Sequence, residues 1–184
     1  PEKDLMRRAQ ATAMLGTTNW EYGNLDAARK AMKNWFESMR QIGNLYFAIA
    51  STFALADIMI AQGRLHEAVD TYQQSLQLAS EEDENIQRIV AHHHLGLAML
   101  YHEMGDQEAS DQHLQKCERL GEISNLIDWP YRWHVAQAQL KESAGDLDEA
   151  LGLLEEAKSV YIQNPVPDNR PVEALKAKIY IKQG

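Results

Sequence analysis

Apolar residues recur along the chain every three or four positions, in stretches separated by short polar segments. One stretch carries Leu65, Ala68, Val69, Tyr72, Leu76 and Ala79, and a later one carries Leu147, Ala150, Leu151, Leu154, Ala157 and Tyr161. This spacing places the apolar side chains on one face of an α-helix. The pattern therefore predicts a series of amphipathic helices.

Four similar motifs, each beginning with glycine, punctuate these stretches. They are GNLDAA at Gly23, GRLHEA at Gly63, GDQEAS at Gly105 and GDLDEA at Gly145, spaced 40, 42 and 40 residues apart. A glycine in the left-handed conformation ends one helix, and Asn24, Asp106 or Asp146 beside it can cap the next, Asp146 with Glu149 as a capping pair. The third copy departs from its siblings, with Gln107 and Ser110 in place of leucine and alanine. Each motif therefore predicts the turn of a helical hairpin.

The repeat predicts the order of the helices. The first helix of each pair is expected at 5–22, 45–62, 86–104 and 126–144, the pairs at 5–42, 45–80, 86–121 and 126–163, and an unpaired fifth-repeat helix at 171–184. No single hairpin of this kind buries its own apolar face, so neighbouring hairpins must stack. We expect one all-α domain over 1–184, a right-handed superhelical stack of hairpins with a period of about 40 residues.

The last residue fits the same rhythm, because Gly184 follows Gly145 by 39 positions and stands where a fifth motif would begin. This predicts a fragment of a larger protein, cut in mid-repeat. The cut would leave uncovered the face of Val172, Leu175, Ile179 and Tyr180. Because an uncovered apolar face seeks a partner, we expect self-association.

Composition excludes several classes of protein. The 184 residues are 45% apolar and 24% charged, as in a globular domain, and hold neither a membrane-length apolar run nor a secretory signal, which predicts a cytoplasmic protein. Cys117 is the one cysteine, so we expect no internal disulfide and a small core residue. The net charge of −9 argues against direct nucleic acid contact by this chain.

The positions around each glycine resemble the tetratricopeptide repeat. Small residues follow it by five positions (Ala28, Ala68, Ser110, Ala150), large apolar ones by nine (Met32, Tyr72, Leu114, Leu154), and leucine precedes it by eight (Leu15, Leu55, Leu97). The fourth copy has Gln137 in place of that leucine, and the 40-residue period exceeds the usual 34. With AQGRLHEAVDTYQQSLQLA at 61–79 and NPVPDNRPVEALKAKIYIKQG at 164–184, the chain resembles the repeat region of the MalT-type large ATP-dependent LuxR-family transcriptional regulators.

The resemblance implies a function. In that family a nucleotide-binding domain precedes the repeats, a helix-turn-helix domain follows them, and the repeats receive an inducer or a regulatory protein. This sequence has no Gly-x-x-x-x-Gly-Lys-Ser/Thr phosphate loop, so we expect no cofactor here. The expected function is an effector-sensing or protein-interaction domain of a bacterial LuxR-type activator. The alternative is a generic tetratricopeptide scaffold that binds a peptide segment of a partner protein.

The resemblance also implies where a ligand binds. In tetratricopeptide arrays the first helix of each pair lines the concave face, with exposed positions three, six, ten and thirteen residues before the turn glycine. Carried onto this sequence, these positions give Thr17, Trp20, Phe53, Asp57, His92, Met99, His102, Arg132 and Gln139. Aromatic faces mixed with single polar groups suit a sugar, a small effector or a peptide.

The sequence gives little support for a catalytic site or a metal site. Adjacent residues of a helix point about 100° apart, so the three histidines at 92–94 cannot share one metal ion, and we expect ordinary packing instead. No nucleophile elbow or paired catalytic carboxylate is recognisable, so we expect no enzyme. The aromatic cluster WPYRWH at 129–134 fits either packing or ligand binding, and Arg132 within it suits a carboxylate or phosphate.

Overall fold

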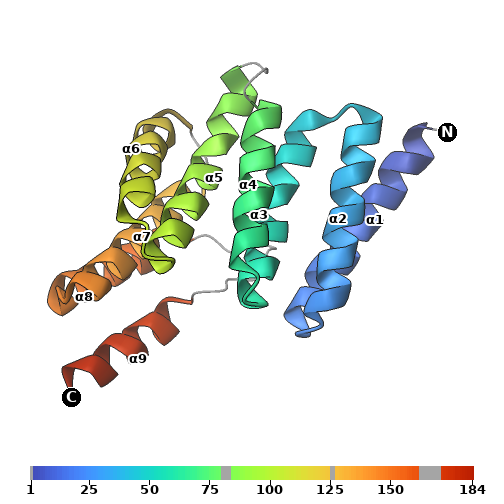
Figure 1. Ribbon diagram of the computed structural model, residues 1–184. Helices are drawn as coiled ribbons and strands as arrows, with labels where there is room; N and C mark the ends of the chain where they lie inside the picture. The colour runs from blue at the N-terminus through green and yellow to red at the C-terminus, as the bar shows by residue number, and fades with distance from the viewer. Residues whose placement is uncertain (1, 80–83, 125–126, 162–170) are drawn as a thin grey trace. The chain divides into compact units, whose positions relative to one another are not determined.

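The computed structural model describes residues 2–79, 84–124, 127–161 and 171–184, and these contain helices and no strands. The helices are α1 (Glu2–Glu21), α2 (Leu25–Ile42), α3 (Leu45–Ala61), α4 (Leu65–Ala79), α5 (Glu84–Glu103), α6 (Gln107–Ser124), α7 (Trp129–Ala144), α8 (Leu147–Ser159) and α9 (Val172–Gln183) (Figure 1). The predicted all-α helical-repeat fold is confirmed. None of the described helices has the length and apolar content that a membrane crossing requires.

The turns form where the glycines predict them. Gly23, Gly63, Gly105 and Gly145 have φ of 75°, 72°, 81° and 90°, in the left-handed region that ends a helix at glycine. The first helix of each pair and α9 begin and end within three residues of the predicted bounds, and α8 ends at Ser159. The predicted pair ends at 80 and 163 lie outside the described residues. The predicted start at 126 lies outside the described residues, and α7 begins at Trp129.

Capping follows the prediction at one turn only. Asp106 accepts a hydrogen bond from the Ala109 backbone N–H at 3.1 Å, as expected. Asn24 and Asp146 make no side-chain cap, so the predicted capping pair of Asp146 and Glu149 is wrong. The reason at Asp146 is a competing cation, because Lys141 Nζ lies 2.8 Å from Glu149 and 3.8 Å from Asp146.

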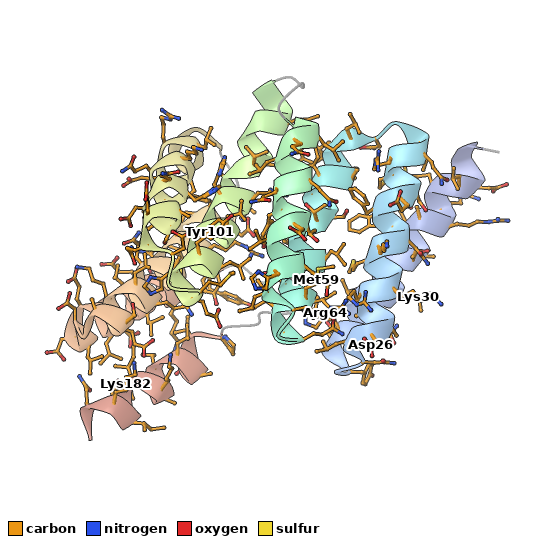
Figure 2. The ribbon with its side chains drawn as sticks, in the orientation of Figure 1. Asp26, Lys30, Met59, Arg64, Tyr101 and Lys182 are labelled. Atoms are coloured by element: carbon orange, nitrogen blue, oxygen red, sulfur yellow. The ribbon has the colours of Figure 1, made fainter. Side chains whose placement is uncertain are left out.

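The described helices form two compact units. The first unit contains α1–α6, and consecutive helices pack in chain order, with α3 also touching α5 (Figure 1). A polar contact joins its first two turns, where the Gln62 amide donates to Asp26 at 2.9 Å. Beside it Arg64 donates two hydrogen bonds of 2.6 Å to Glu67 (Figure 2). This unit is thus a stack of three hairpins.

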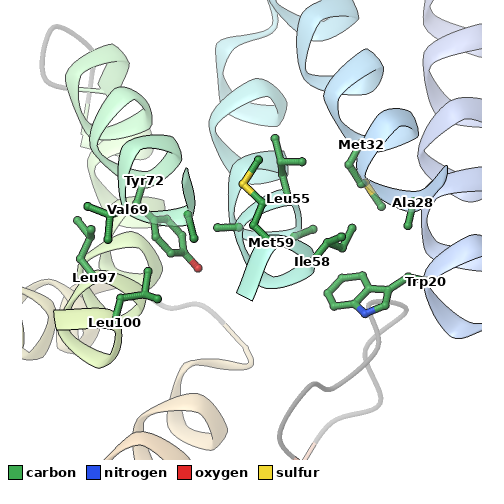
Figure 3. Packing of buried hydrophobic residues seen from close by; sticks show 13 residues of the cluster. Trp20, Ala28, Met32, Leu55, Ile58, Met59, Val69, Tyr72, Leu97 and Leu100 are labelled. Atoms are coloured by element: carbon green, nitrogen blue, oxygen red, sulfur yellow. The ribbon is translucent and has the colours of Figure 1, made fainter. Parts of the chain in front are cut away.

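Large apolar side chains from successive helices fill the core of the first unit. They include Trp20, Met32, Leu55, Ile58, Met59, Tyr72, Leu97 and Leu100 (Figure 3). Helix α3 is apolar almost throughout, and nine of its side chains are buried. The reason is its position, because α3 has neighbours in α2, α4 and α5.

Cys117 is also fully buried, as expected, and burial raises the pKa of its thiol to about 12, which leaves it unreactive.

A buried polar cluster ties three helices of this unit together. His93 of α5 is fully buried, with Nε2 at 2.7 Å from Thr52 Oγ1 of α3 and 3.0 Å from Ser75 Oγ of α4. Burial lowers the pKa of His93 to about 4, so the ring is neutral at pH 7. A buried hydrogen-bonded group tolerates only matching partners, so this cluster favours one register of α3, α4 and α5.

The second unit contains α7, α8 and α9. Its core holds Val135 and Ala138 of α7, Leu154 of α8, and Val172 and Ile179 of α9. The expectation that the face of Val172, Leu175 and Ile179 is uncovered is therefore wrong. Those residues pack against α7 and α8, whereas Tyr180 is 55% exposed. Self-association stays a prediction.

Replacement of Gly96 by alanine should destabilise the first unit. A Cβ atom at Gly96 would lie 2.5 Å from the ring of buried Tyr72, which cannot move without disturbing the core. Overpacking of this kind costs roughly 1–3 kcal/mol in the free energy of unfolding. The matched control is Gly16→Ala, which meets the flexible side chain of Met32 and should cost less. Equal losses in urea denaturation would contradict the assigned packing.

Replacement of Ser110 by alanine should stabilise the same unit. Ser110 is fully buried, and its hydroxyl has no hydrogen-bond partner among the described residues, while Ala28, Ala68 and Ala150 occupy the equivalent positions. Removal of a buried unpaired hydroxyl should raise the free energy of unfolding by about 1 kcal/mol. Ser38→Ala, at a hydroxyl bonded to the Asn34 carbonyl, should give no gain. A lower melting temperature for Ser110→Ala would show that the hydroxyl is bonded after all.

Candidate functional site

Three of the predicted site residues lie together on α3 and α5. The ring of Phe53 stacks on that of His92, with ring centroids 6.0 Å apart and planes inclined by 28°. Asp57 follows Phe53 by four residues, and therefore lies on the same side of α3. All three side chains are half-buried. We call Phe53, Asp57 and His92 the α3–α5 face.

Two other predicted residues do not lie on an exposed wall. Trp20 is 6% exposed and Met99 8% exposed, so the prediction that both are exposed is wrong. Trp20 belongs to the core with Ala28, Met32 and Leu55, and Figure 3 shows its ring beside Ile58. Its large ring fills the space between hairpins, because the smaller residues around it leave that space unfilled.

Thr17 and His102 are half-buried, and each has a local partner. The Thr17 hydroxyl donates to the Met14 carbonyl of its own helix at 2.9 Å. His102 Nδ1 lies 3.3 Å from Gln107 Oε1, across the turn that joins α5 and α6.

Arg132 and Gln139 belong to α7 in the second unit, and both are half-buried. Arg132 Nε donates to Asp128 Oδ2 at 2.9 Å, so this guanidinium, which was expected to suit a carboxylate or phosphate of a ligand, already contacts a carboxylate of its own chain. The neighbouring rings of Trp129 and Trp133 stack at 5.8 Å along the same helix. This aromatic cluster is at least partly a packing feature of α7.

The three consecutive histidines point in three directions. His92 stacks on Phe53, His93 is buried in the polar cluster with Thr52, and His94 faces His113 of α6. Within the described ranges, no three or more His, Cys, Asp and Glu side chains gather closely enough to hold a metal ion. The pairing of His94 with His113 could not be read from the sequence, because the two residues lie 19 positions apart on different helices.

A buried carboxylate in the second unit was missed at the sequence level. Glu142 of α7 is 7% exposed, and its two oxygens accept Lys178 Nζ, at 2.9 Å, and Lys182 Nζ from α9 (Lys182 is labelled in Figure 2). Burial opposes ionisation of Glu142, but the hydrogen bonds from the two lysines outweigh it and lower its pKa. The spacing that selected Trp20 and His102, three residues before the turn glycine, also falls on Glu142 and could have found it.

Comparison with known families decides which repeat architecture this is. The family model described as a MalT-like TPR region matches residues 1–184. The chain belongs to this family. Membership indicates a regulatory repeat domain of MalT-type regulators, and helical repeat regions of this type are typically non-catalytic. A comparison with curated proteins gave no match.

Removal of both lysines that contact Glu142 should loosen α9. In Lys178→Met/Lys182→Met the buried carboxylate loses its cations, and because both lysines are about half exposed we expect a loss of about 1–3 kcal/mol. Hydrogen exchange of the α9 amides measures the effect. Glu142→Gln in the same background removes the uncompensated charge and should restore part of the protection. No change in α9 exchange in the double variant would contradict the role given to Glu142.

The same carboxylate predicts a pH dependence. The folded-state pKa of Glu142 is below its ordinary value of 4.5, so its contribution to stability is present above pH 4.5 and is lost as the pH falls through the lower folded value. Protection of α9 should therefore decline in acid, and it should decline less in Glu142→Gln. Parallel acid profiles for the two proteins would show that other groups carry the effect.

Proposed function

We propose that this chain is the effector-sensing or protein-interaction domain of a bacterial LuxR-type transcriptional activator, and that the inducer or regulatory protein binds at the α3–α5 face. The observation that carries the proposal is the stack of Phe53 on His92 with Asp57 beside it. These side chains come from the first helices of two successive hairpins. Family membership supports the regulatory role.

The chemistry of this face favours some ligands over others. An aromatic ring and an imidazole offer flat surfaces, while Asp57 and His92 supply hydrogen-bonding groups. Helix α3 carries no lysine or arginine, and Asp57 is its only charged residue. The face therefore suits a neutral or cationic ligand with hydroxyl or amine groups better than an anion.

A generic scaffold that binds a peptide segment is the second candidate, because tetratricopeptide-type repeats form stacked surfaces of this shape. Both candidates place the occupant on the same face. For both candidates, the negative net charge of the chain argues against contact with nucleic acid by this domain, so other parts of the protein would make that contact. We place the protein in the cytoplasm.

A thermal-shift screen tests the proposal. Oligosaccharides, small metabolites and a peptide pool are added separately, and a ligand at 100 times its Kd should stabilise the folded chain by about 2.7 kcal/mol. Phe53→Ala and Asp57→Asn should lose most of the shift. The matched control His66→Ala, an exposed histidine on α4, should keep it.

The outcomes separate the candidates. A response to metabolites identifies an effector-sensing domain, and a response to peptides alone identifies a protein-interaction domain or scaffold. A ligand whose shift is unchanged in both Phe53→Ala and Asp57→Asn would place binding elsewhere on the chain. That result would overturn the assignment of the α3–α5 face.

A further inference from the structure

Two histidines from different helices meet on the first unit, at the contact between α5 and α6. His94 Nδ1 lies 2.9 Å from His113 Nδ1, the ring centroids are 5.1 Å apart, and the ring planes are inclined by 39°. Both side chains are half-buried. Neither residue belongs to the α3–α5 face, so an inference from this pair does not rest on the proposed function.

Two imidazole nitrogens at this distance need something between them. A neutral imidazole carries one N–H and one lone pair, so a single proton can join the two Nδ1 atoms as an N–H···N hydrogen bond. Two lone pairs facing each other without a proton would repel. A metal ion satisfies both lone pairs at once, with the ring protons held on the two Nε2 atoms.

We propose that His94 and His113 form a binding site for a divalent transition metal ion, with both Nδ1 atoms as ligands and Cu²⁺ as the preferred ion. Imidazole nitrogens suit copper, nickel and zinc, and among the divalent first-row ions Cu²⁺ binds such ligands most tightly. Metal–nitrogen bonds of about 2.0–2.1 Å that meet at a right angle separate the two nitrogens by about 2.9 Å. The observed separation therefore fits two adjacent positions of a tetragonal ion, once each ring turns so that its lone pair points about 45° away from the line between the two nitrogens.

The plane of the His113 ring is set by its surroundings. Tyr101 stacks on it, with centroids 5.6 Å apart and planes inclined by 26°. The Tyr101 hydroxyl accepts a hydrogen bond of 2.9 Å from the Gln73 amide of α4 (Tyr101 is labelled in Figure 2). Contacts that orient a ligating imidazole raise metal affinity, and here they come from α4 and α5.

The site has open positions and one unfavourable neighbour. No third His, Cys, Asp or Glu from the described residues joins the pair, so water or an external ligand completes the coordination. Lys116 of α6 is exposed, and its charge acts on both histidines. A cation beside a metal ion weakens binding, so Lys116→Gln should bind the metal more tightly than the unaltered chain.

Isothermal titration of the protein with Cu²⁺ at pH 7 tests the proposal. The unaltered chain should bind one equivalent of Cu²⁺ that His94→Gln and His113→Gln each lose. The affinity should fall by at least about 10–100-fold, which is the loss expected when a residue that only orients a metal ligand is removed. The control His66→Gln removes an exposed histidine and should change nothing at this site.

Electron paramagnetic resonance of the Cu²⁺-loaded, unaltered chain gives an answer that does not depend on any variant folding. Two equivalent imidazole nitrogens on one Cu²⁺ are expected. The proposal is overturned if the spectrum shows no such pair, or if the His94→Gln/His113→Gln double variant, folded by circular dichroism, takes up Cu²⁺ with unchanged affinity. Either result would leave the pair as a hydrogen bond between α5 and α6.

Discussion

No hairpin of this chain covers its own apolar face, and the rest of the first unit depends on that constraint. Each hairpin must be closed by the next, so helices pack in chain order and more than half of the α3 side chains become buried. A central helix of this kind can carry almost no charge, and α3 carries Asp57 alone.

Apolar stacking by itself is not directional, and buried polar groups add the missing specificity. His93, Thr52 and Ser75 meet at the junction of three helices, where a shift of any one helix would leave a buried donor or acceptor unsatisfied. Helices α3 and α5 carry the α3–α5 face, and α5 also carries His94, which meets His113 of α6. Because His92 and His94 flank His93 on α5, the register that the His93 cluster favours also sets where these two residues lie.

Packing in the second unit relies more on charged side chains than packing in the first unit does. Helix α9 buries Val172 and Ile179 but also forms ion pairs with α7 and α8, among them Lys178 with Glu142 and Glu173 with Lys158. Exposed ion pairs contribute little each, so the buried carboxylate of Glu142 carries most of the electrostatic specificity. The docking of α9 should accordingly respond to salt and acid more than the stacking of α1–α6 does.

The sequence by itself determined the helices, the turns, the repeat and the family, because each of these depends on local spacing. A glycine with positive φ ends a helix wherever it stands, and small residues five positions later mark each hairpin. Only the tertiary structure decided which side chains of the first helices are accessible. The same turn-relative position holds buried Trp20, half-buried His102 and ion-paired Glu142, since spacing fixes the side of the helix but not the neighbour that covers it. Contacts between distant positions, such as His94 with His113, arise from packing alone and leave no periodic signal in the chain.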